Sequence, residues 1–290
     1  MPGREGTPRS SSFRTIAALT AIPVVGLFVV ACVLLWRQSR FLISSSQFTV
    51  SKAAIEKPRP RTTNREPRAT PKAPQIVIII DDVGFGNQHI DRAMSIDPNL
   101  NFAVLPNSTR GSEVAERLHG RGFEILCHLP MEPKNGNVSP GPNAVTTSMS
   151  DAEIEEATRS NIAAVPYARG VNNHMGSRAT ADRRVMTDVL RAMPGGMYFI
   201  DSRTGGRSVA ADVARALNVK TATRQVFLDD VQTEASVSRQ LAELSDTAKR
   251  RGVAIGIGHP HEVTLRVLAR EVPGLRAKGF RFVRASEVVN

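Results

Sequence analysis

The sequence is poor in cysteine and in aromatic residues. Its 290 residues include two cysteines, Cys32 and Cys127, and one tryptophan, Trp36. Two cysteines cannot form the disulfide framework of a small secreted domain, so they give no indication of the compartment. The lone tryptophan lies near the N-terminus. The rest of the chain therefore lacks a groove of stacking tryptophans, which weakens the case for a long glycan as substrate.

Acidic residues are scarce at the N-terminus, and this explains the net charge of +11. Residues 1–74 hold 12 Lys and Arg but only 3 Asp and Glu. Residues 75–290 hold 26 Lys and Arg and 24 Asp and Glu, which nearly balance. A nucleic-acid-binding domain usually carries a basic face on its folded part. Because the basic excess lies outside the candidate folded body, we expect no nucleic-acid partner.

An uncharged run from Thr15 to Trp36 follows a short basic tail at residues 1–14. Its 22 residues are long enough to cross a bilayer as a helix. Val29–Cys32 resembles a lipoprotein processing site, but the apolar run continues to Leu35, which favours an uncleaved anchor. We therefore expect a single pass through the inner membrane, with the body outside the cytoplasm.

Residues 37–74 form a basic linker rich in proline, serine and threonine. This segment lacks the apolar density to fold by itself. Proline stiffens such a chain, so we expect an extended tether between the anchor and a body that begins at residue 75.

Short apolar runs alternate with helical patterns throughout the body. The expected strands lie at residues 76–80, 101–105, 123–128, 170–174, 197–200, 221–228, 253–258 and 280–283. The expected helices lie at residues 112–119, 150–165, 180–193, 208–217 and 233–251. Ser150 and Glu153 have the spacing of a capping box. The alternation predicts an α/β fold with a parallel sheet, and seven or eight units favour a distorted (β/α) barrel.

Acids and histidines follow six of the expected strands. They are Asp81–Asp82, His128, His174, Asp201, Asp229–Asp230, and His259 with His261. In a parallel barrel the carboxyl ends of the strands converge on one mouth, where active sites lie. Together these residues predict a functional site, although each has an ordinary structural explanation. Asp81–Asp82 could cap a helix, and Asp229–Asp230 could simply close a strand.

Aspartate with imidazole is the ligand set that a divalent metal such as zinc prefers. A bound cation also explains why two carboxylates stand side by side at Asp81 and Asp82. Side chains alternate along a strand, so we expect these two to diverge, and His259 and His261 to share a side. One acid then holds the metal, and the other accepts a proton from water that the metal activates.

The body resembles the divergent polysaccharide deacetylases, relatives of the NodB-like carbohydrate esterases. The matching stretches, in order, are IVIIIDDVGFG, FAVLPNS, GFEILCHLPMEP, GVNNHMGSRAT, YFIDSRT, VFLDD and AIGIGHPH. They extend over residues 75–290. The resemblance implies a distorted barrel, a divalent metal that is usually zinc, and hydrolysis of acetyl groups on a sugar polymer.

Residue roles follow from the resemblance. It implies that Asp81 is the base, that Asp82 and His128 bind the metal, and that His259 or His261 is the acid. The family places a second histidine four residues after the first, but this sequence has Glu132 there. We expect His174, at the end of the next strand, to replace it. Asp201 or Asp230 is expected to orient the acid.

Two alternatives remain open from the sequence. The same chemistry could cleave a cell-wall peptide, which would make the protein a metal-dependent amidase. The fold could instead serve as a non-catalytic module that binds envelope carbohydrate. Retention of Asp81 and of both His259 and His261 argues against the second alternative.

Overall fold

The structure, a computed structural model, describes residues 73–86 and 89–290. The predicted tail, membrane anchor and linker, apart from residues 73–74, lie outside the described residues. Among the residues that are described, no helix is long and apolar enough to cross a membrane.

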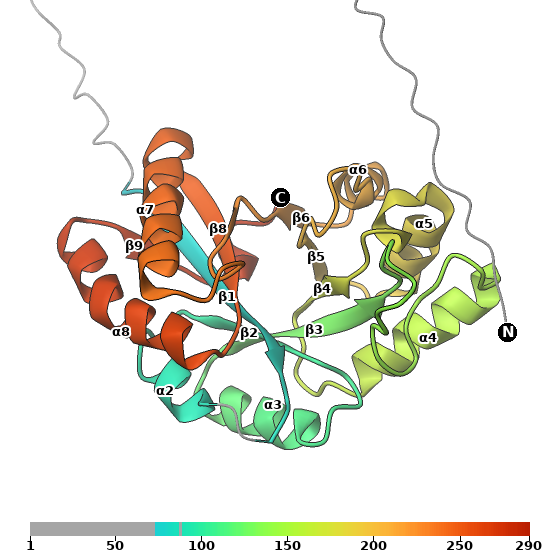
Figure 1. Ribbon diagram of the computed structural model, residues 1–290. Coiled ribbons are helices and arrows are strands. Elements are labelled where there is room, and N and C mark those ends of the chain that lie inside the picture. Colours follow the sequence, from blue (N-terminus) through green and yellow to red (C-terminus); the bar gives the residue numbers. More distant parts are fainter. Residues whose placement is uncertain (1–72, 87–88) are drawn as a thin grey trace, which may run out of the picture. The chain divides into compact units, whose positions relative to one another are not determined.

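The body is built on one sheet of nine parallel strands (Figure 1). The strands are β1 (Gln75–Val83), β2 (Asn101–Val104), β3 (Glu124–Met131), β4 (Gly170–Met175), β5 (Tyr198–Asp201), β6 (Thr221–Thr223), β7 (Val226–Phe227), β8 (Val253–Gly258) and β9 (Arg281–Phe282). Each of the eight predicted strands is present. The predicted strand at 221–228 is divided into β6 and β7.

The sheet curls so that its two ends approach each other. Its strand order is β6-β5-β4-β3-β2-β1-β8-β7, and β9 pairs with the beginning of β1. Between the two end strands lie Arg224, whose N–H donates to Asp201 on β5, and Gln225, whose N–H donates to Ile255 on β8. The chain thus passes directly from one end of the sheet to the other. The result is a parallel α/β half-barrel, in agreement with the predicted distorted barrel.

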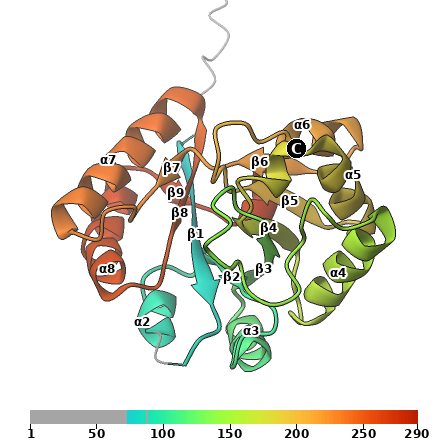
Figure 2. The same ribbon diagram turned by 45° about the vertical axis from the view of Figure 1, so that its right-hand side comes forward.

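Helices pack around the outer face of the curled sheet (Figures 1 and 2). They are α2 (Ile90–Met94), α3 (Gly111–Gly120), α4 (Asp151–Ala163), α5 (Arg183–Ala192), α6 (Ala210–Ala216), α7 (Glu234–Arg251) and α8 (Glu262–Ala277), with short 3-10 turns at Ala179–Ala181 and Ala285–Glu287. The predicted capping box is confirmed, since Ser150 and Glu153 cap each other's backbone at the start of α4. The sequence analysis assigned no residue range to α2 or α8.

Two apolar clusters lie on opposite faces of the sheet. Ile76, Ile78 and Ile80 of β1 belong to the larger cluster, which packs with the helices. Val77 and Ile79 belong to the smaller cluster, which lines the inside of the half-barrel with Leu126 of β3. Strand alternation therefore directs Asp81 and His128, two residues further along each strand, to the inside at its carboxyl end.

Candidate active site

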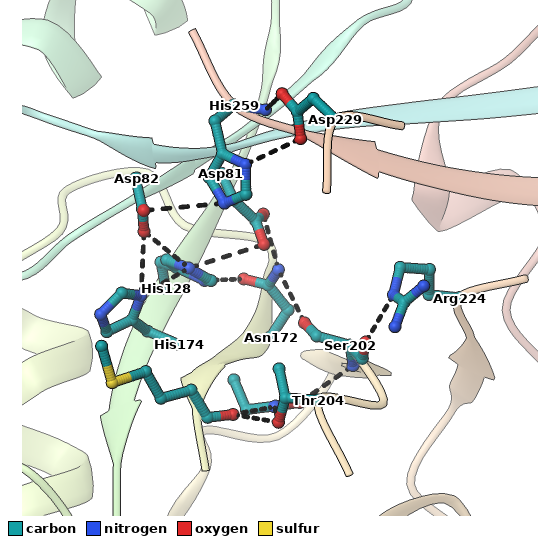
Figure 3. Close-up of polar contacts among 12 residues, drawn as sticks. Asp81, Asp82, His128, Asn172, His174, Ser202, Thr204, Arg224, Asp229 and His259 are labelled. Carbon is teal, nitrogen blue, oxygen red and sulfur yellow. Dashed lines mark hydrogen bonds and ion pairs between the residues drawn. The ribbon is translucent and has the colours of Figure 1, made fainter. Parts of the chain in front are cut away.

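Side chains from β1, β3, β4 and the segment after β8 meet at the carboxyl ends of the strands (Figure 3). Asp81 and His128 are almost fully buried, with 3% and 2% of their surface exposed. Asp82, His174 and His259 are partly exposed. The structure therefore brings together five of the six residues that were expected to act as base, ligands or acid.

Asp81 and Asp82 do not diverge, contrary to the prediction from strand alternation. Oδ2 of Asp81 lies 3.5 Å from His128 Nε2, and Oδ1 of Asp82 lies 3.2 Å from the same atom. The physical reason is backbone conformation: Asp82 has φ of 56°, and the register of β1 with β2 shifts between Ile80 and Val83. This left-handed residue interrupts the alternation and turns both carboxylates toward one site.

Three potential ligand atoms lie close together at the centre of the site. Asp82 Oδ1 is 2.9 Å from His174 Nδ1, and His174 Nδ1 is 3.2 Å from His128 Nε2. Ligands at 2.0–2.1 Å from a tetrahedral zinc ion would be roughly 3.3 Å apart. One carboxylate and two imidazoles, with this spacing and with an open side, fit the three protein ligands of a catalytic zinc site.

Asn172 on β4 determines which nitrogen of His128 faces this centre. Its Nδ2 donates to Asp81 Oδ1 at 2.8 Å and to Ser202 Oγ at 3.3 Å, so its Oδ1 is the acceptor that lies 2.9 Å from His128 Nδ1. We assign the Nδ1 proton of His128 from this network. Because Asn172 holds the Nδ1 proton, loss of the proton on Nε2 would leave a lone pair on Nε2 directed at Asp82 and His174, as a metal ligand requires.

The two adjacent carboxylates have opposite pKa shifts. Burial raises the pKa of Asp81, and the positive charges of His128 and His259 oppose this effect without cancelling it. Burial also raises the pKa of Asp82, but hydrogen bonds from His128 and His174 outweigh this effect. They hold the pKa of Asp82 well below its usual range. Asp82 is therefore suited to bind a cation, and Asp81 to exchange a proton.

His259 is oriented by Asp229, not by Asp201 or Asp230 as predicted. Oδ1 of Asp229 lies 3.0 Å from His259 Nδ1, and Oδ2 accepts the backbone N–H of His259 at 2.7 Å. Asp230, one position later in the chain, is exposed. Asp201 instead accepts from the backbone N–H of Arg203 and from Ser208 Oγ, both at 2.8 Å, and so closes the turn after β5.

Burial acts against protonation of His259, but the hydrogen bond and charge of Asp229, with the charges of Asp81 and Asp82, outweigh it. Together they raise the pKa of His259 to about 9. In return His259 lowers the pKa of Asp229 against the effect of burial. The result is an imidazolium whose Nε2 lies 3.6 Å from Asp82 Oδ2, facing the site.

His261 and Glu132 take other positions. His261 is the N-cap residue of α8 and not part of β8, and its Nε2 lies 3.0 Å from Gln232 Nε2. Its ring is 5.6 Å from that of His259. Glu132 accepts from the backbone N–H and the hydroxyl of Thr147, both at 2.7 Å, so it holds a loop. His174 thus lies where the second imidazole was expected.

Sequence reasoning missed Asn172, Ser202 and Arg224. Arg224 Nε donates to the carbonyl of Ser202 at 2.6 Å and fixes the turn on which the Ser202 hydroxyl meets Asn172 (Figure 3). These residues follow or lie within strands, but uncharged Asn and Ser carry no distinctive pattern. The repeated asparagine in GVNNH is the one signal that marks Asn172.

An open pocket of about 370 Å³ lies over these residues. It is lined by the residues of the site together with polar groups from the ends of β4 and β5, among them Asn173, Ser177, Ser202 and Thr204. A concave site with several convergent polar groups and perturbed pKa values is the usual arrangement of an enzyme active site.

Comparison with known proteins identifies the family. The sequence model of the divergent polysaccharide deacetylases matches residues 78–289. Protein YibQ of Escherichia coli K12 is 39% identical over 222 residues, which cover 75% of this chain and 68% of that protein. A protein of Haemophilus influenzae (strain ATCC 51907) is 34% identical over 195 residues, which cover 67% of this chain and 69% of that protein.

A solved structure also shares the fold. The crystal structure of protein ATU2773 from Agrobacterium tumefaciens C58 superimposes with a TM-score of 0.72 and 22% identity, over 77% of this chain and 92% of that one. At this identity the likeness concerns the fold alone. The match of the family model over most of the body, with the relatives above 30% identity, shows that the chain belongs to the divergent polysaccharide deacetylase family.

Proposed function

We propose that the protein is a metal-dependent hydrolase that removes acetyl groups from an envelope polysaccharide. The observation that carries this proposal is the meeting of three potential metal ligands with two proton-transfer groups in one pocket. Asp82, His128 and His174 are the ligand set. Asp81 and His259 line the same pocket. The membership of the chain in a deacetylase family supplies the substrate class.

Asp82 Oδ1, His128 Nε2 and His174 Nδ1 would hold the divalent cation, with zinc as the best match to this donor set. When bound, the cation supplies a Lewis acid that activates water and polarises the acetyl carbonyl. Asn172 contributes by keeping the Nδ1 proton of His128 away from the centre. The ligands and their orienting group are therefore both present in the chain.

Asp81 acts as the base in this proposal. Its Oδ1 accepts from Asn172, which leaves Oδ2, on the side of His128, to accept the proton of the attacking water. Burial and the resulting rise in its pKa make Asp81 a better proton acceptor near neutral pH than an ordinary aspartate. The hydroxyl oxygen adds to the acetyl carbon as that proton is taken.

His259 acts as the acid. Asp229 holds its Nδ1, and Nε2 faces the pocket with a proton. As the bond between the acetyl carbon and the sugar nitrogen breaks, that proton passes to the departing amine, and acetate is the second product. For an O-acetyl group the departing atom is the sugar oxygen, and His259 donates its Nε2 proton to that oxygen instead.

The test is release of acetate from acetylated glycans by the zinc-loaded chain. N-acetylated chitin oligosaccharides and peptidoglycan are suitable substrates, and the Asp81→Asn variant is the control for contaminating activity. Acetate released by the unsubstituted chain alone supports the proposal. Release of amino acids or peptides from peptidoglycan, without acetate, would replace it with a cell-wall amidase.

We also propose that the protein works at the cell envelope, attached by residues 15–36 to the inner membrane with its body outside the cytoplasm. The support is the uncharged run of 22 residues followed by a basic, proline-rich linker. Fractionation of cells tests this. Recovery of the chain in the soluble cytoplasmic fraction would contradict it.

A further inference from the structure

The side chain of Arg224 lies where the two ends of the curled sheet approach each other, between β6 and β7. Its Nε donates to the carbonyl of Ser202 at 2.6 Å, and its Nη2 donates to the carbonyl of Arg203 at 2.9 Å. Both acceptors follow β5 directly. The guanidinium is therefore bonded to the turn after β5 (Figure 3).

This turn has an unusual backbone. Arg203 has φ of 46°, in the left-handed region that residues with a Cβ rarely adopt. Such a conformation persists only where the surrounding structure determines it. The two carbonyls that accept from Arg224 belong to Arg203 and to the residue before it, so the guanidinium holds the peptide units on both sides of this Cα.

Arg224 also contacts the other end of the sheet. Its Cζ lies 4.7 Å from the centre of the Phe227 ring on β7. That ring lies 5.4 Å from the ring of His259, centre to centre, at an angle of 47°. A guanidinium over an aromatic face is attracted to it, so Arg224 holds Phe227 in place beside the proposed acid.

From the turn after β5 the contacts continue to the proposed base. The backbone N–H of Ser202 donates to Asn173 Oδ1 at 2.9 Å, and the Ser202 hydroxyl accepts from Asn172 Nδ2 at 3.3 Å. The same Nδ2 donates to Asp81 Oδ1. One guanidinium thus contacts the side chains that support the base and, through Phe227, the side chain that packs against the acid.

These supporting side chains come from opposite ends of the sheet. Asp81 and His259 themselves lie on and directly after neighbouring strands, β1 and β8. Ser202 follows β5, whereas Phe227 lies on β7, and in the strand order five strands separate β5 from β7. The direct connection between the two supports is therefore the side chain of Arg224, which does not follow the sheet.

We infer that Arg224 is a positioning residue of the active site, which holds the supports of the base and of the acid in one arrangement. The inference rests on the proposed function and adds a residue to it. Ser202 and Phe227 line the pocket over the site, whereas Arg224 does not, so it acts through these two residues.

Arg224→Met retains an unbranched side chain and removes both donors. With chitin oligosaccharides and the zinc-loaded full chain, kcat should fall about 10- to 100-fold, the usual effect of losing an outer group that orients the residues of a site. KM should stay nearly constant. Zinc affinity, measured by competition with a chelator, should also stay close to its original value, because Asn172 keeps its bonds to His128 and Asp81.

Arg207→Met is the matched control, because Arg207 is an exposed arginine in the segment between β5 and α6. It should leave kcat, KM and zinc affinity unchanged. An unchanged kcat in Arg224→Met, or an equal loss in both variants, would overturn the inference while leaving the hydrolase intact.

Arg224→Lys separates positioning from a purely electrostatic role. Burial lowers the pKa of Arg224, and the charges of Asp81 and Asp201 oppose this effect, so the cation also acts on the site through its charge. Lysine keeps the charge but cannot make two forked bonds and cover a ring at once. We expect kcat to fall in Arg224→Lys as well. Full activity in this variant, with a loss in Arg224→Met, would assign the effect to charge and overturn the inference.

NMR tests the arrangement without turnover. A nuclear Overhauser effect between ring protons of Phe227 and His259 should be present in the unsubstituted chain and in Arg207→Met, and lost in Arg224→Met. If that variant does not fold, Arg224→Lys provides the same readout. Persistence of the effect in the Arg224 variants would overturn the inference. Its loss, in a protein that hydrolyses no acetylated glycan, would support the positioning role and reject the hydrolase.

Discussion

The Oδ1 atom of Asn172 lies 2.9 Å from Nδ1 of His128, and this contact fixes the role of the histidine. The other end of the amide donates to Asp81. A single buried side chain on β4 thus joins the proposed base to a proposed ligand. It orients the imidazole in the way that carboxylates and carbonyls orient metal-bound histidines in other proteins.

Asn172→Ala should therefore weaken zinc binding by about 10- to 100-fold, because His128 loses the partner that holds its ring and its tautomer. Competition with a chelator of known affinity measures the change. Asn101→Ala is a matched control, since Asn101 is equally buried and donates to the carbonyl of Ile78 away from the site. Equal loss of zinc affinity in both variants would mean that Asn172 acts through stability alone.

Asp81→Asn should leave zinc bound and reduce kcat by about 10²- to 10⁴-fold, the usual contribution of a general base. The amide keeps the shape of the carboxylate but cannot accept the proton of water. Metal content and acetate release are measured on the same sample. Loss of zinc in this variant would show that Asp81 is a ligand and would reverse the roles of the two aspartates.

His259 should titrate with a pKa of about 9 in the metal-free chain. Because this value lies above the ordinary pKa of about 6.5, the protonated ring stabilises the fold fully below pH 6.5. That stabilisation is lost as the pH rises through 9. NMR of the imidazole protons measures the titration, and denaturant unfolding at pH 6 and pH 10 measures the stability.

Asp229→Asn is the variant that tests whether Asp229 causes the raised pKa of His259. It removes the charge that favours the imidazolium, so the pKa of His259 should fall toward its ordinary value. The alkaline loss of stability should move to lower pH with it. A titration of His259 near pH 6.5 in the unsubstituted chain would contradict the assignment of a charged acid.

Stability at the start of α4 is independent of the site. Ser150→Ala removes the side chain that accepts the backbone N–H of Glu153, and it should lower the free energy of unfolding by about 1 kcal/mol. Chemical denaturation measures this change. Zinc affinity should stay constant, and a parallel loss of zinc would indicate that the fold around the site depends on this cap.

The strand pattern and the strand-end residues could be predicted because apolar runs and the acids that follow them are local features. The direction of the Asp82 side chain could not be predicted, because its left-handed backbone conformation depends on the irregular pairing of β1 with β2. Asp229 and Asp230 are adjacent acids, and which one faces His259 depends on a turn that joins β7 to α7. Asn172 acts only through its partners on β1 and β3.

Helix α8 shows another limit of local patterns. It contains Pro273, followed by Gly274, and both residues normally interrupt helices. Its buried face includes Leu265, Leu268 and Val272, which pack in the large cluster on the helical side of the sheet. Tertiary packing therefore outweighs the unfavourable intrinsic preference of this segment.

The most direct test of the central claim is the zinc content of the purified full chain by mass spectrometry, beside His128→Ala, His174→Ala and Glu132→Ala. The account predicts about one zinc ion per chain, lost in both histidine variants and retained in Glu132→Ala, because Glu132 binds Thr147 and not the centre. A chain that takes up no zinc, cobalt or nickel, or that loses its metal in Glu132→Ala but keeps it in His174→Ala, would contradict it.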